Sequence, residues 1–381
     1  MKGVCHGKTP LDRVVKLVGT KEIVEILAGR LSWADLQTLM MFAYEKRIRA
    51  LSVAEVSRNH NGNRLSEVAN VDPRDLLAVD QLLYRSLPEA FLPLELSPVN
   101  SIGANYLLAG VDPKIVLDTI RNVEVVGDSS LVLALECAKR RKRDCRSKQG
   151  GENINLATSH RSLRLQMFAK DSGLTPHFRS FALASAGRDT DGFNNFELSS
   201  IFLHIDCWLD FLSRAGPVGY EVKEISVIIS DVRIMEKLMA GGKIEREEVR
   251  RRTKDPSFAP FRQYGVDLPG IVETIEGVGV TYPDLETNIN EMKFTEGKLV
   301  KPIKVKYPKV RFLFDLERCS GVGYYSGLCY KVSAKAFDGG TYSVAGGGAC
   351  DWTRKLLQSK REHLIASGFG TESFVRKFKV C

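Results

Sequence analysis

The chain has 381 residues, of which 44% are hydrophobic. This length and composition allow a large buried core, predict two or three domains and exclude a disordered chain. The formal net charge of +9 is compatible with an anionic ligand or with nucleic acid, and selects neither. No stretch approaches the roughly 20 uninterrupted apolar residues of a membrane helix. Because the N-terminus also lacks the apolar run of a signal peptide, we expect a cytoplasmic protein that makes no membrane contact.

The eight cysteines lie far apart, without a CxxC pair or a Cys/His ladder at zinc spacing. They predict reduced, mostly buried thiols and no metal site.

Residues 1–70 predict a helical appendage. Ser32-x-x-Asp35 and Ser52-x-x-Glu55 resemble capping boxes, which mark helix starts. Asp72-Pro73 then predicts the start of another helix, because an N-cap residue is followed by proline at the first helical position. Pro88 ends that helix.

Strands and helices alternate between residues 91 and 230. An extended segment is expected at 91–98, with strands at 122–126, 153–158, 178–186 and 221–230. A helix begins at Ser129 and runs into the basic segment Lys139–Lys148. The helix at 194–214 has the clearest apolar face, and Gly216-Pro217 stops it.

The region 231–298 is charged and helical and then interrupted by glycine and proline, which predicts an inserted subdomain. From Leu299 to Val344 the sequence turns strongly to strand. Strands at 310–316, 324–333 and 341–344, separated by glycine-rich turns, favour consecutive antiparallel strands over a Rossmann alternation. A helix over 351–365 follows.

These patterns together predict an α+β fold with an antiparallel sheet flanked by helices. The expected division is a helical appendage at 1–70, a core formed by 71–230 and 299–381, and the inserted subdomain at 231–298.

A double tyrosine flanked by glycines is the most specific motif, within Gly321–Gly327. It is followed by a strand and then by a triple glycine leading to Asp351. This order resembles the histidyl-tRNA synthetase family of class II synthetases, where R-G-L-D-Y-Y-T-G lines the histidine pocket and GGGRYD follows. The resemblance implies a class II synthetase-like core. It also implies an amino-acid pocket made by Tyr324, Tyr325, Ser326, Gly327, Gly346, Gly347, Gly348 and Asp351.

Two segments, Ser159–Arg161 and His177–Phe181, resemble class II motif 2, an antiparallel pair joined by a loop. The resemblance implies that Arg161 holds the α-phosphate and Phe181 stacks on adenine, with Arg179 beside them. A guanidinium matches phosphate oxygens and an aromatic face accepts a purine. The implied cofactor, if one binds, is ATP with Mg²⁺.

The other class II motifs match more loosely. The helix 73–87 with Glu95–Pro98 resembles motif 1, which implies a homodimer with this helix at the interface. Ser367–Thr371 is similar to the start of motif 3. The resemblance therefore covers roughly residues 72–376.

Departures from the family pattern affect the reacting groups. Ser320 and Gly323 replace an arginine and an acidic residue, and Ala349 replaces the arginine of GGGRYD. Charge stabilisation of this kind is often worth several kcal/mol in a transition state. We therefore assign no catalytic residue and do not expect adenylate formation by the usual mechanism.

The family continues into an anticodon-binding domain of about 100 residues, a typical domain size, whereas this sequence ends at Cys381. Ordinary tRNA charging is therefore not expected. The regulatory subunit of ATP phosphoribosyltransferase, a synthetase-like protein that binds histidine without adenylation, shows the same departures. A helical appendage at the N-terminus is not expected of that subunit, so a separate sister group fits the sequence equally well.

Three hypotheses of function remain open. The chain is a noncatalytic regulator that binds an amino acid or nucleotide and acts through a partner enzyme, or an enzyme that activates a carboxylate with ATP. The third is an RNA-binding protein that uses Lys139–Lys148. Each of these motifs also has a purely structural interpretation. In it the glycines form turns, Asp351 caps a helix, and Arg161 and Arg179 form surface salt bridges. The basic runs are then solvated faces, at Lys139–Lys148 and Arg246–Lys254.

Overall fold

The computed structural model describes residues 9–144, 153–168, 174–189, 195–241, 244–253, 255, 258, 260–263, 265–266, 268–279 and 283–380. The basic residues Arg146, Lys148 and Lys254, part of the two predicted basic runs, lie outside the described residues.

A nine-stranded sheet forms the centre of the molecule, in the order β1-β4-β5-β11-β10-β9-β6-β8-β7. Six of its eight strand pairs are antiparallel, and the pairs β1–β4 and β6–β8 are parallel. A small second sheet joins β2 to β3. The strands are β1 Leu92–Pro93, β2 Val99–Ser101, β3 Val123–Val125, β4 Ile154–Leu163, β5 His177–Gly187, β6 Ile225–Asp231, β7 Ile271–Val272, β8 Arg311–Asp315, β9 Leu328–Lys335, β10 Thr341–Cys350 and β11 His363–Phe369.

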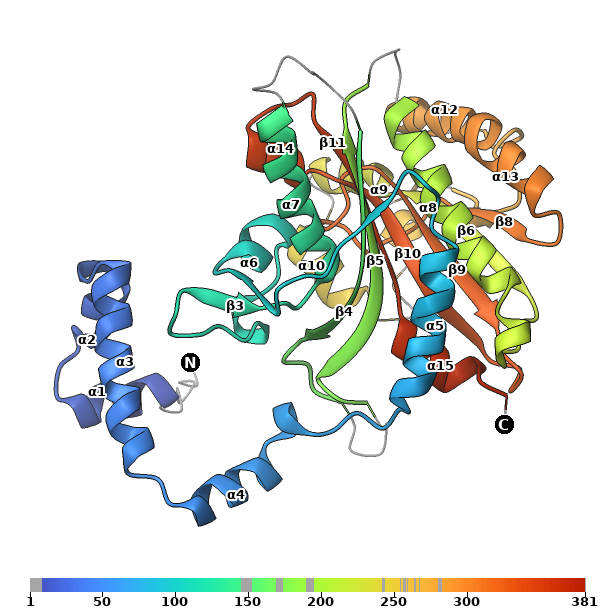
Figure 1. Cartoon of the computed structure of the whole chain (residues 1–381). Helices are drawn as coiled ribbons and strands as arrows, with labels where there is room; N and C mark the ends of the chain where they lie inside the picture. Colours follow the sequence, from blue (N-terminus) through green and yellow to red (C-terminus); the bar gives the residue numbers. More distant parts are fainter. Residues whose placement is uncertain are drawn as a thin grey trace.

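Helices cover both faces of this sheet (Figure 1). Helices α6, α7 and α14 lie on one face, and α5, α8 and α15 lie on the other. The α-helices are α1 Pro10–Val18, α2 Ile23–Glu25, α3 Trp33–Arg49, α4 Val53–Gly62, α5 Pro73–Arg85, α6 Ala104–Ala109, α7 Ser129–Asp144, α8 Asn195–Ser213, α9 Val232–Ala240, α10 Arg246–Arg252, α11 Pro260–Gln263, α12 Glu286–Thr295, α13 Lys301–Lys306, α14 Trp352–Leu357 and α15 Thr371–Phe378. The prediction of an α+β fold with an antiparallel sheet flanked by helices is confirmed.

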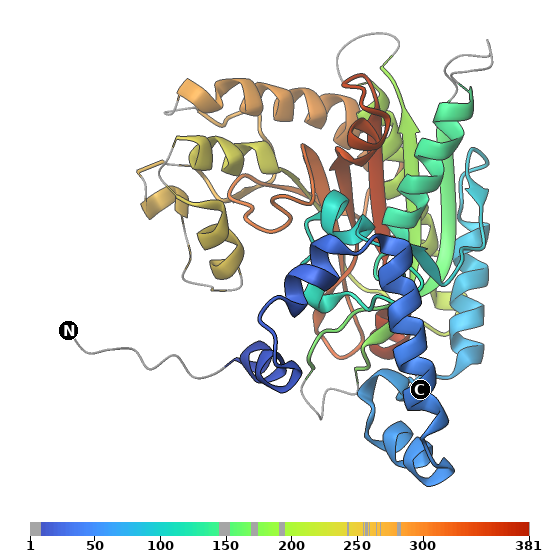
Figure 2. The same ribbon diagram turned by 90° about the vertical axis from the view of Figure 1, so that its left-hand side faces the viewer.

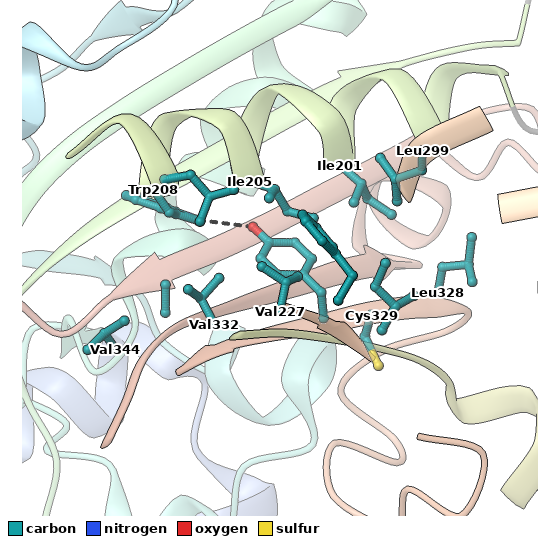
Figure 3. Packing of buried hydrophobic residues seen from close by; sticks show 14 of the residues in the cluster. Ile201, Ile205, Trp208, Val227, Leu299, Leu328, Cys329, Val332 and Val344 are labelled. Atoms are coloured by element: carbon teal, nitrogen blue, oxygen red, sulfur yellow. Dashed lines mark hydrogen bonds between the residues drawn. The ribbon is translucent and has the colours of Figure 1, made fainter. Parts of the chain in front are cut away.

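The larger core lies between the sheet and α8. Ile201, Ile205 and Trp208 extend from one face of this helix onto the side chains of the strands (Figure 3). The indole of Trp208 donates a hydrogen bond to the hydroxyl of Tyr330 at 3.0 Å, so the polar edges of both buried rings are satisfied. This core fixes the strands whose opposite face carries the candidate site.

Capping signals in the sequence set the expected helix starts. The carboxylate of Asp72 accepts a hydrogen bond from the backbone N–H of Arg74, and Pro73 follows as the first helical residue. Ser52 and Glu55 form a reciprocal capping box, whereas Ser32 caps α3 through its hydroxyl alone. These three helix starts are confirmed.

Three predictions made downstream of residue 298 are wrong. Residues 296–306 are helical, so the β-rich region begins later, at β8. Strand β8 does not lie beside β9, because β6 lies between them and pairs with β8 in parallel. The helix predicted over 351–365 ends at Leu357, where Gln358 adopts a left-handed backbone (φ 50°), and 363–369 forms the inner strand β11.

The N-terminal helices lie to the side of the main body as an arm, drawn in blue in Figure 1. We define the arm as residues 9–68; it includes two further helical turns, Ile26–Arg30 and Arg64–Ser66. None of the described helices is both long and apolar enough to span a bilayer.

Candidate functional site

A cleft of about 460 Å³ opens on the face of the sheet that carries α7. Ligand sites typically occupy roughly 300–1,000 Å³. The cleft is bounded by the first half of β5, the middle of β10, the end of β11, the first turn of α7 and the loop before β9. Its lining residues are Asp128, Ser129, Ser130, Arg164, Phe178, Ser180, Ala182, Gly321, Tyr324, Tyr325, Gly346, Ala366, Ser367, Gly368, Phe369 and Gly370.

Small side chains make the floor of this cleft. Side chains along a strand point alternately to its two faces, so Phe178, Ser180 and Ala182 of β5 face the cleft together. Gly346 of β10 and Gly368 of β11 leave backbone exposed beside them. The floor therefore lets a ligand approach the sheet closely.

Asp128 is the polar centre of the cleft. Its carboxylate accepts hydrogen bonds from the hydroxyls of Ser130 at 2.6 Å and Tyr324 at 2.9 Å. The Arg164 guanidinium forms an ion pair with it at 3.2 Å and donates to the carbonyl of Gly127 at 2.6 Å. The cleft thus presents an acceptor and a cation side by side, with the cation already bound to a carboxylate.

The double tyrosine belongs to the wall of the cleft. The two rings contact each other edge to face with centroids 5.0 Å apart, and Tyr324 makes the same kind of contact with Trp352. Burial raises the pKa of both hydroxyls well above the ordinary value, and Asp128 raises that of Tyr324 further. Both tyrosines therefore stay protonated, and Tyr324 acts as a hydrogen-bond donor.

Gly321 makes room for this arrangement. It has φ +87°, and a Cβ there would lie 2.7 Å from the ring of Tyr325. At this position a side chain would meet both a disfavoured backbone and the tyrosine. The glycine is therefore required by the loop itself.

Arg318 adds a second guanidinium at the rim. It lies 5.8 Å from the ring centroid of Tyr325, and its Nε donates to the carbonyl of Ser320 at 3.0 Å. Within the described part of the chain, no carboxylate lies at ion-pair distance from it. Arg318 lies two residues before Ser320 and was not among the predicted site residues.

The triple glycine lies inside β10, so its interpretation as a turn is wrong. A Cβ at Gly347 would lie 2.3 Å from the Cβ of Ser367, and one at Gly348 would lie 2.5 Å from the Cβ of Cys329. These two glycines allow β10 to lie close to β11 and β9. Gly346 alone of the three lines the cleft.

The predicted nucleotide-binding residues lie on the other face of the sheet. Arg161 forms an ion pair with Glu372 at 3.1 Å, and Arg179 forms one with Asp80 at 2.6 Å. Phe181 is fully buried in the core beneath α8, 6.2 Å from Trp208 between ring centroids. None of the three contacts the cleft, so this assignment is corrected.

Another arginine and another phenylalanine of the same hairpin, Arg164 and Phe178, line the cleft. The guanidinium of Arg164 lies 5.4 Å from the ring centroid of Phe178, at the mouth of the cleft. Each residue is three positions from the one predicted, and an odd shift along a strand moves a side chain to the opposite face. The alternation of side chains along β5 could have shown that Phe178 and Phe181 point to opposite faces of the sheet.

The predicted amino-acid pocket is assembled in part. Tyr324, Tyr325 and Gly346 line the cleft. A Cβ at Gly327 would face Arg233 and Ala349, and Asp351 forms an ion pair with Lys355 at 3.0 Å without capping its helix through its side chain. The residues predicted for the pocket that do not line the cleft are Ser326, Gly327, Gly347, Gly348 and Asp351.

Asp128, Ser130 and Ser180 were missed by sequence reasoning. Asp128 accepts a hydrogen bond from the backbone N–H of Ser130 at the start of α7, a capping pattern that the sequence Gly127-Asp128-Ser129-Ser130 contains. That local signal predicts a helix start. It does not show that Asp128 meets Tyr324, which lies 196 residues away.

The basic run on α7 is largely engaged in ion pairs. Arg141 is buried against Glu362, with an N–O distance of 2.8 Å, and Lys139 and Arg140 contact Glu136. The second run behaves similarly, since Arg246 pairs with Glu236 and Arg252 with Glu248. Most of the described basic residues in these runs thus have acidic partners.

A buried polar chain lies behind the cleft. His204 of α8 lies between the hydroxyls of Ser185 at 3.0 Å and Ser367 at 2.8 Å, and it is fully buried. Burial lowers the pKa of His204 to about 3, so the imidazole is neutral at physiological pH. It ties α8 to the two strands that form the floor.

The mostly antiparallel sheet, the motif-bearing strands and the last strand–helix pair define a class II aminoacyl-tRNA synthetase-like fold. No family model matches the sequence, and comparison with curated proteins finds no matching relative. Solved structures do match.

An ATP phosphoribosyltransferase regulatory subunit/histidyl-tRNA synthetase from Bacillus halodurans superposes with a TM-score of 0.59 at 15% identity, covering 82% of each chain. A histidine–tRNA ligase subunit from Alicyclobacillus acidocaldarius gives 0.58 at 12% identity, covering 81% of this chain and 94% of that one. Histidyl-tRNA synthetase from Nostoc gives 0.53 at 14% identity, covering 82% and 74%. At these identities the likeness establishes the fold.

Proposed function

We propose that this protein is a synthetase-like regulator that binds an amino acid or a nucleotide in the cleft and does not form an adenylate. The proposal rests mainly on the ion pair between Arg164 and Asp128. A guanidinium already bound to a carboxylate has less charge to offer a developing anion. Ser320 and Ala349 supply no cation in its place.

The lining groups fit a small zwitterion. The Asp128 carboxylate can accept from an ammonium, while Arg164 and the hydroxyl of Ser180 offer donors for a carboxylate or phosphate. The hydroxyls of Ser130 and Tyr324 already donate to Asp128 and hold it in place. The apolar rings of Phe178 and Tyr325 also line the cleft. Such a mixture of a few polar groups among apolar walls is typical of ligand sites.

A nucleotide also fits part of the cleft. The ring of Phe178 can stack on a base, and the adjacent Arg164 can reach a phosphate oxygen. The described residues contain no group of three or more His, Cys, Asp or Glu side chains arranged to hold a metal ion. The residues therefore fit a nucleotide better than they fit its Mg²⁺, and we assign no step to the metal.

A thermal-shift screen with ATP, AMP, histidine and the other amino acids tests the proposal. A ligand that binds the folded state raises its stability with the logarithm of concentration above saturation. Pyrophosphate exchange over twenty amino acids tests the enzymatic alternative. A shift without exchange supports the proposal, whereas exchange with any amino acid would establish an adenylate-forming enzyme instead.

A further inference from the structure

The last turn of the arm is hydrogen-bonded to the hairpin of β4 and β5. The guanidinium of Arg64 donates to the backbone carbonyl of Gln166 at 2.6 Å, just after β4. The ring of His177, the first residue of β5, donates to the backbone carbonyl of Glu67 at 2.6 Å. We call residues 64–67 the arm root. The arm root therefore contacts both sides of one hairpin.

The core fixes the ring of His177 from its other edge. Nη1 of Arg161 lies 2.7 Å from Nδ1 of His177. A guanidinium can only donate, so Nδ1 accepts and the ring proton lies on Nε2, the atom that faces Glu67. Arg161 is itself paired with Glu372 of α15 at 3.1 Å. The donor that holds the arm root is thus oriented by side chains of the core.

The two residues that bond to the arm root lie next to the two residues at the mouth of the cleft. Gln166 follows Arg164 by two positions, and His177 directly precedes Phe178. Arg164 and Phe178 both line the cleft, with 5.4 Å between the guanidinium and the ring centroid. The backbone N–H of Arg164 donates to the carbonyl of Pro176 at 2.9 Å, which joins the two sides of the hairpin here. A displacement of the arm root would therefore act on the segments that carry Arg164 and Phe178.

The arm depends on such contacts for its position. None of the side chains in its helical segments is buried. Figure 1 and Figure 2 show the blue helices outside those that cover the sheet. Segments with few buried apolar contacts open at the lowest cost in free energy. The arm can therefore change its position on the core while the sheet stays folded.

Coupling between the arm root and the cleft is reciprocal. A ligand that contacts Arg164 or Phe178 favours one placement of the hairpin, and the arm root bonds to the same stretch of chain. If the attached arm strengthens ligand binding by some factor, the bound ligand strengthens the attachment of the arm by the same factor. One hydrogen bond of ordinary net strength sets this factor at about 2- to 10-fold.

We propose that the arm root positions Arg164 and Phe178 for the ligand, so that attachment of the arm and occupancy of the cleft control each other. The inference rests on the proposed function, because the ligand is the one bound in the cleft. Arg64 and His177 are positioning residues, since neither lines the cleft.

The test uses the full chain with Arg64→Ala, which removes the donor to Gln166. Arg64→Lys keeps a cationic donor at this position. The matched control is Arg49→Ala, an exposed arginine of the arm that forms its ion pair within α3, with Glu45. Calorimetric titration of the best thermal-shift ligand gives the affinity of each variant. Hydrogen exchange without ligand gives the opening of the hairpin, read at the amides of Arg164 and Leu165.

We expect Arg64→Ala to bind the ligand about 2- to 10-fold more weakly than the wild type and to exchange these two amides faster. Arg64→Lys should restore both values toward the wild type, and Arg49→Ala should match the wild type in both. By reciprocity, saturating ligand should slow amide exchange in residues 53–68 of the wild type and have less effect in Arg64→Ala.

A wild-type affinity in Arg64→Ala, measured with a ligand that the wild type binds, overturns this inference and leaves the proposed function standing. A wild type that binds no ligand of the screen instead removes the proposed function. Exchange at the two amides then decides what remains: faster exchange in Arg64→Ala supports the hold of the arm root on the hairpin, and unchanged exchange overturns it.

Discussion

Replacing Gly347 by alanine tests the packing of the strand that crosses the site. The added Cβ would lie 2.3 Å from the Cβ of Ser367 and 2.8 Å from the carbonyl oxygen of Ala366, both on β11. These atoms belong to backbone or lie next to it, so relief requires the two strands to move apart. Overpacking of this kind costs about 1–3 kcal/mol.

Two neighbouring glycines should show smaller or equal losses of stability on substitution by alanine. Gly348→Ala should cost a similar amount, because its Cβ would lie 2.5 Å from the Cβ of Cys329 on β9. Gly346→Ala should cost less, since its nearest contact is the carbonyl of Tyr330 at 3.3 Å. Gly297→Ala is the matched control. Gly297 lies in a helical turn where an added Cβ would meet nothing within 4 Å beyond the adjacent backbone, so alanine there should be neutral or stabilising by up to about 1 kcal/mol.

Urea unfolding followed by tryptophan fluorescence measures these differences, because Trp208 and Trp352 are fully buried beside β10 and β11. The expected order of unfolding midpoints is Gly297→Ala at or above the wild type, then Gly346→Ala, then the other two. If Gly347→Ala and Gly348→Ala both unfold at the wild-type midpoint, the close approach of these strands is refuted.

Three further changes probe the site and its support. Tyr324→Phe removes a donor from the partly buried Asp128 carboxylate and should cost about 1–2 kcal/mol in urea unfolding; an unchanged midpoint would mean that this hydrogen bond contributes nothing. Glu362→Gln removes the carboxylate that pairs with both Arg188 and Arg141, the latter only 3% exposed, and should cost about 3–5 kcal/mol. Glu224→Gln in the exposed pair with Lys335 should have little effect; equal midpoints for the two variants would contradict the assigned burial. Burial lowers the pKa of His204 in the folded state to about 3, below the unfolded value near 6.5. The stability that the neutral imidazole provides is therefore fully present above pH 6.5. It is lost as the pH falls toward 3, by up to about 1.4 kcal/mol per pH unit. His204→Asn should therefore unfold with a shallower loss of stability between pH 6.5 and 4, and a pH dependence identical to that of the wild type would show that His204 does not titrate this way.

Local signals in the sequence were sufficient for many elements. Asp72-Pro73 and Ser52-x-x-Glu55 act within a few residues, so the starts of α5 and α4 could be predicted from sequence alone. The helix predicted over 351–365 failed for the opposite reason. Leu364 and Ile365 fit a helical spacing, but residues 363–369 lie between β5 and β10, and pairing with two strands outweighs local preference.

The site was harder to predict because a strand has two faces. Arg161 and Arg164 are both arginines on or beside β4, and Phe178 and Phe181 are both on β5. Family resemblance chose the member of each pair that does not line the cleft, three residues before Arg164 and three residues after Phe178. The ion pairs of Arg161 and Arg179 with Glu372 and Asp80 depend on helices far away in sequence, so no local pattern could have excluded them.

The proposed role of the cleft can be measured by calorimetric titration of the best thermal-shift ligand into the wild type, Arg164→Gln and Arg214→Gln. Arg214 is the matched control, an arginine paired with Asp210 at 2.8 Å at the end of α8, away from the cleft. Binding to the wild type and to Arg214→Gln, with at least about tenfold weaker binding to Arg164→Gln, is the predicted result. Equal affinity for all three proteins would place the ligand elsewhere and contradict the account.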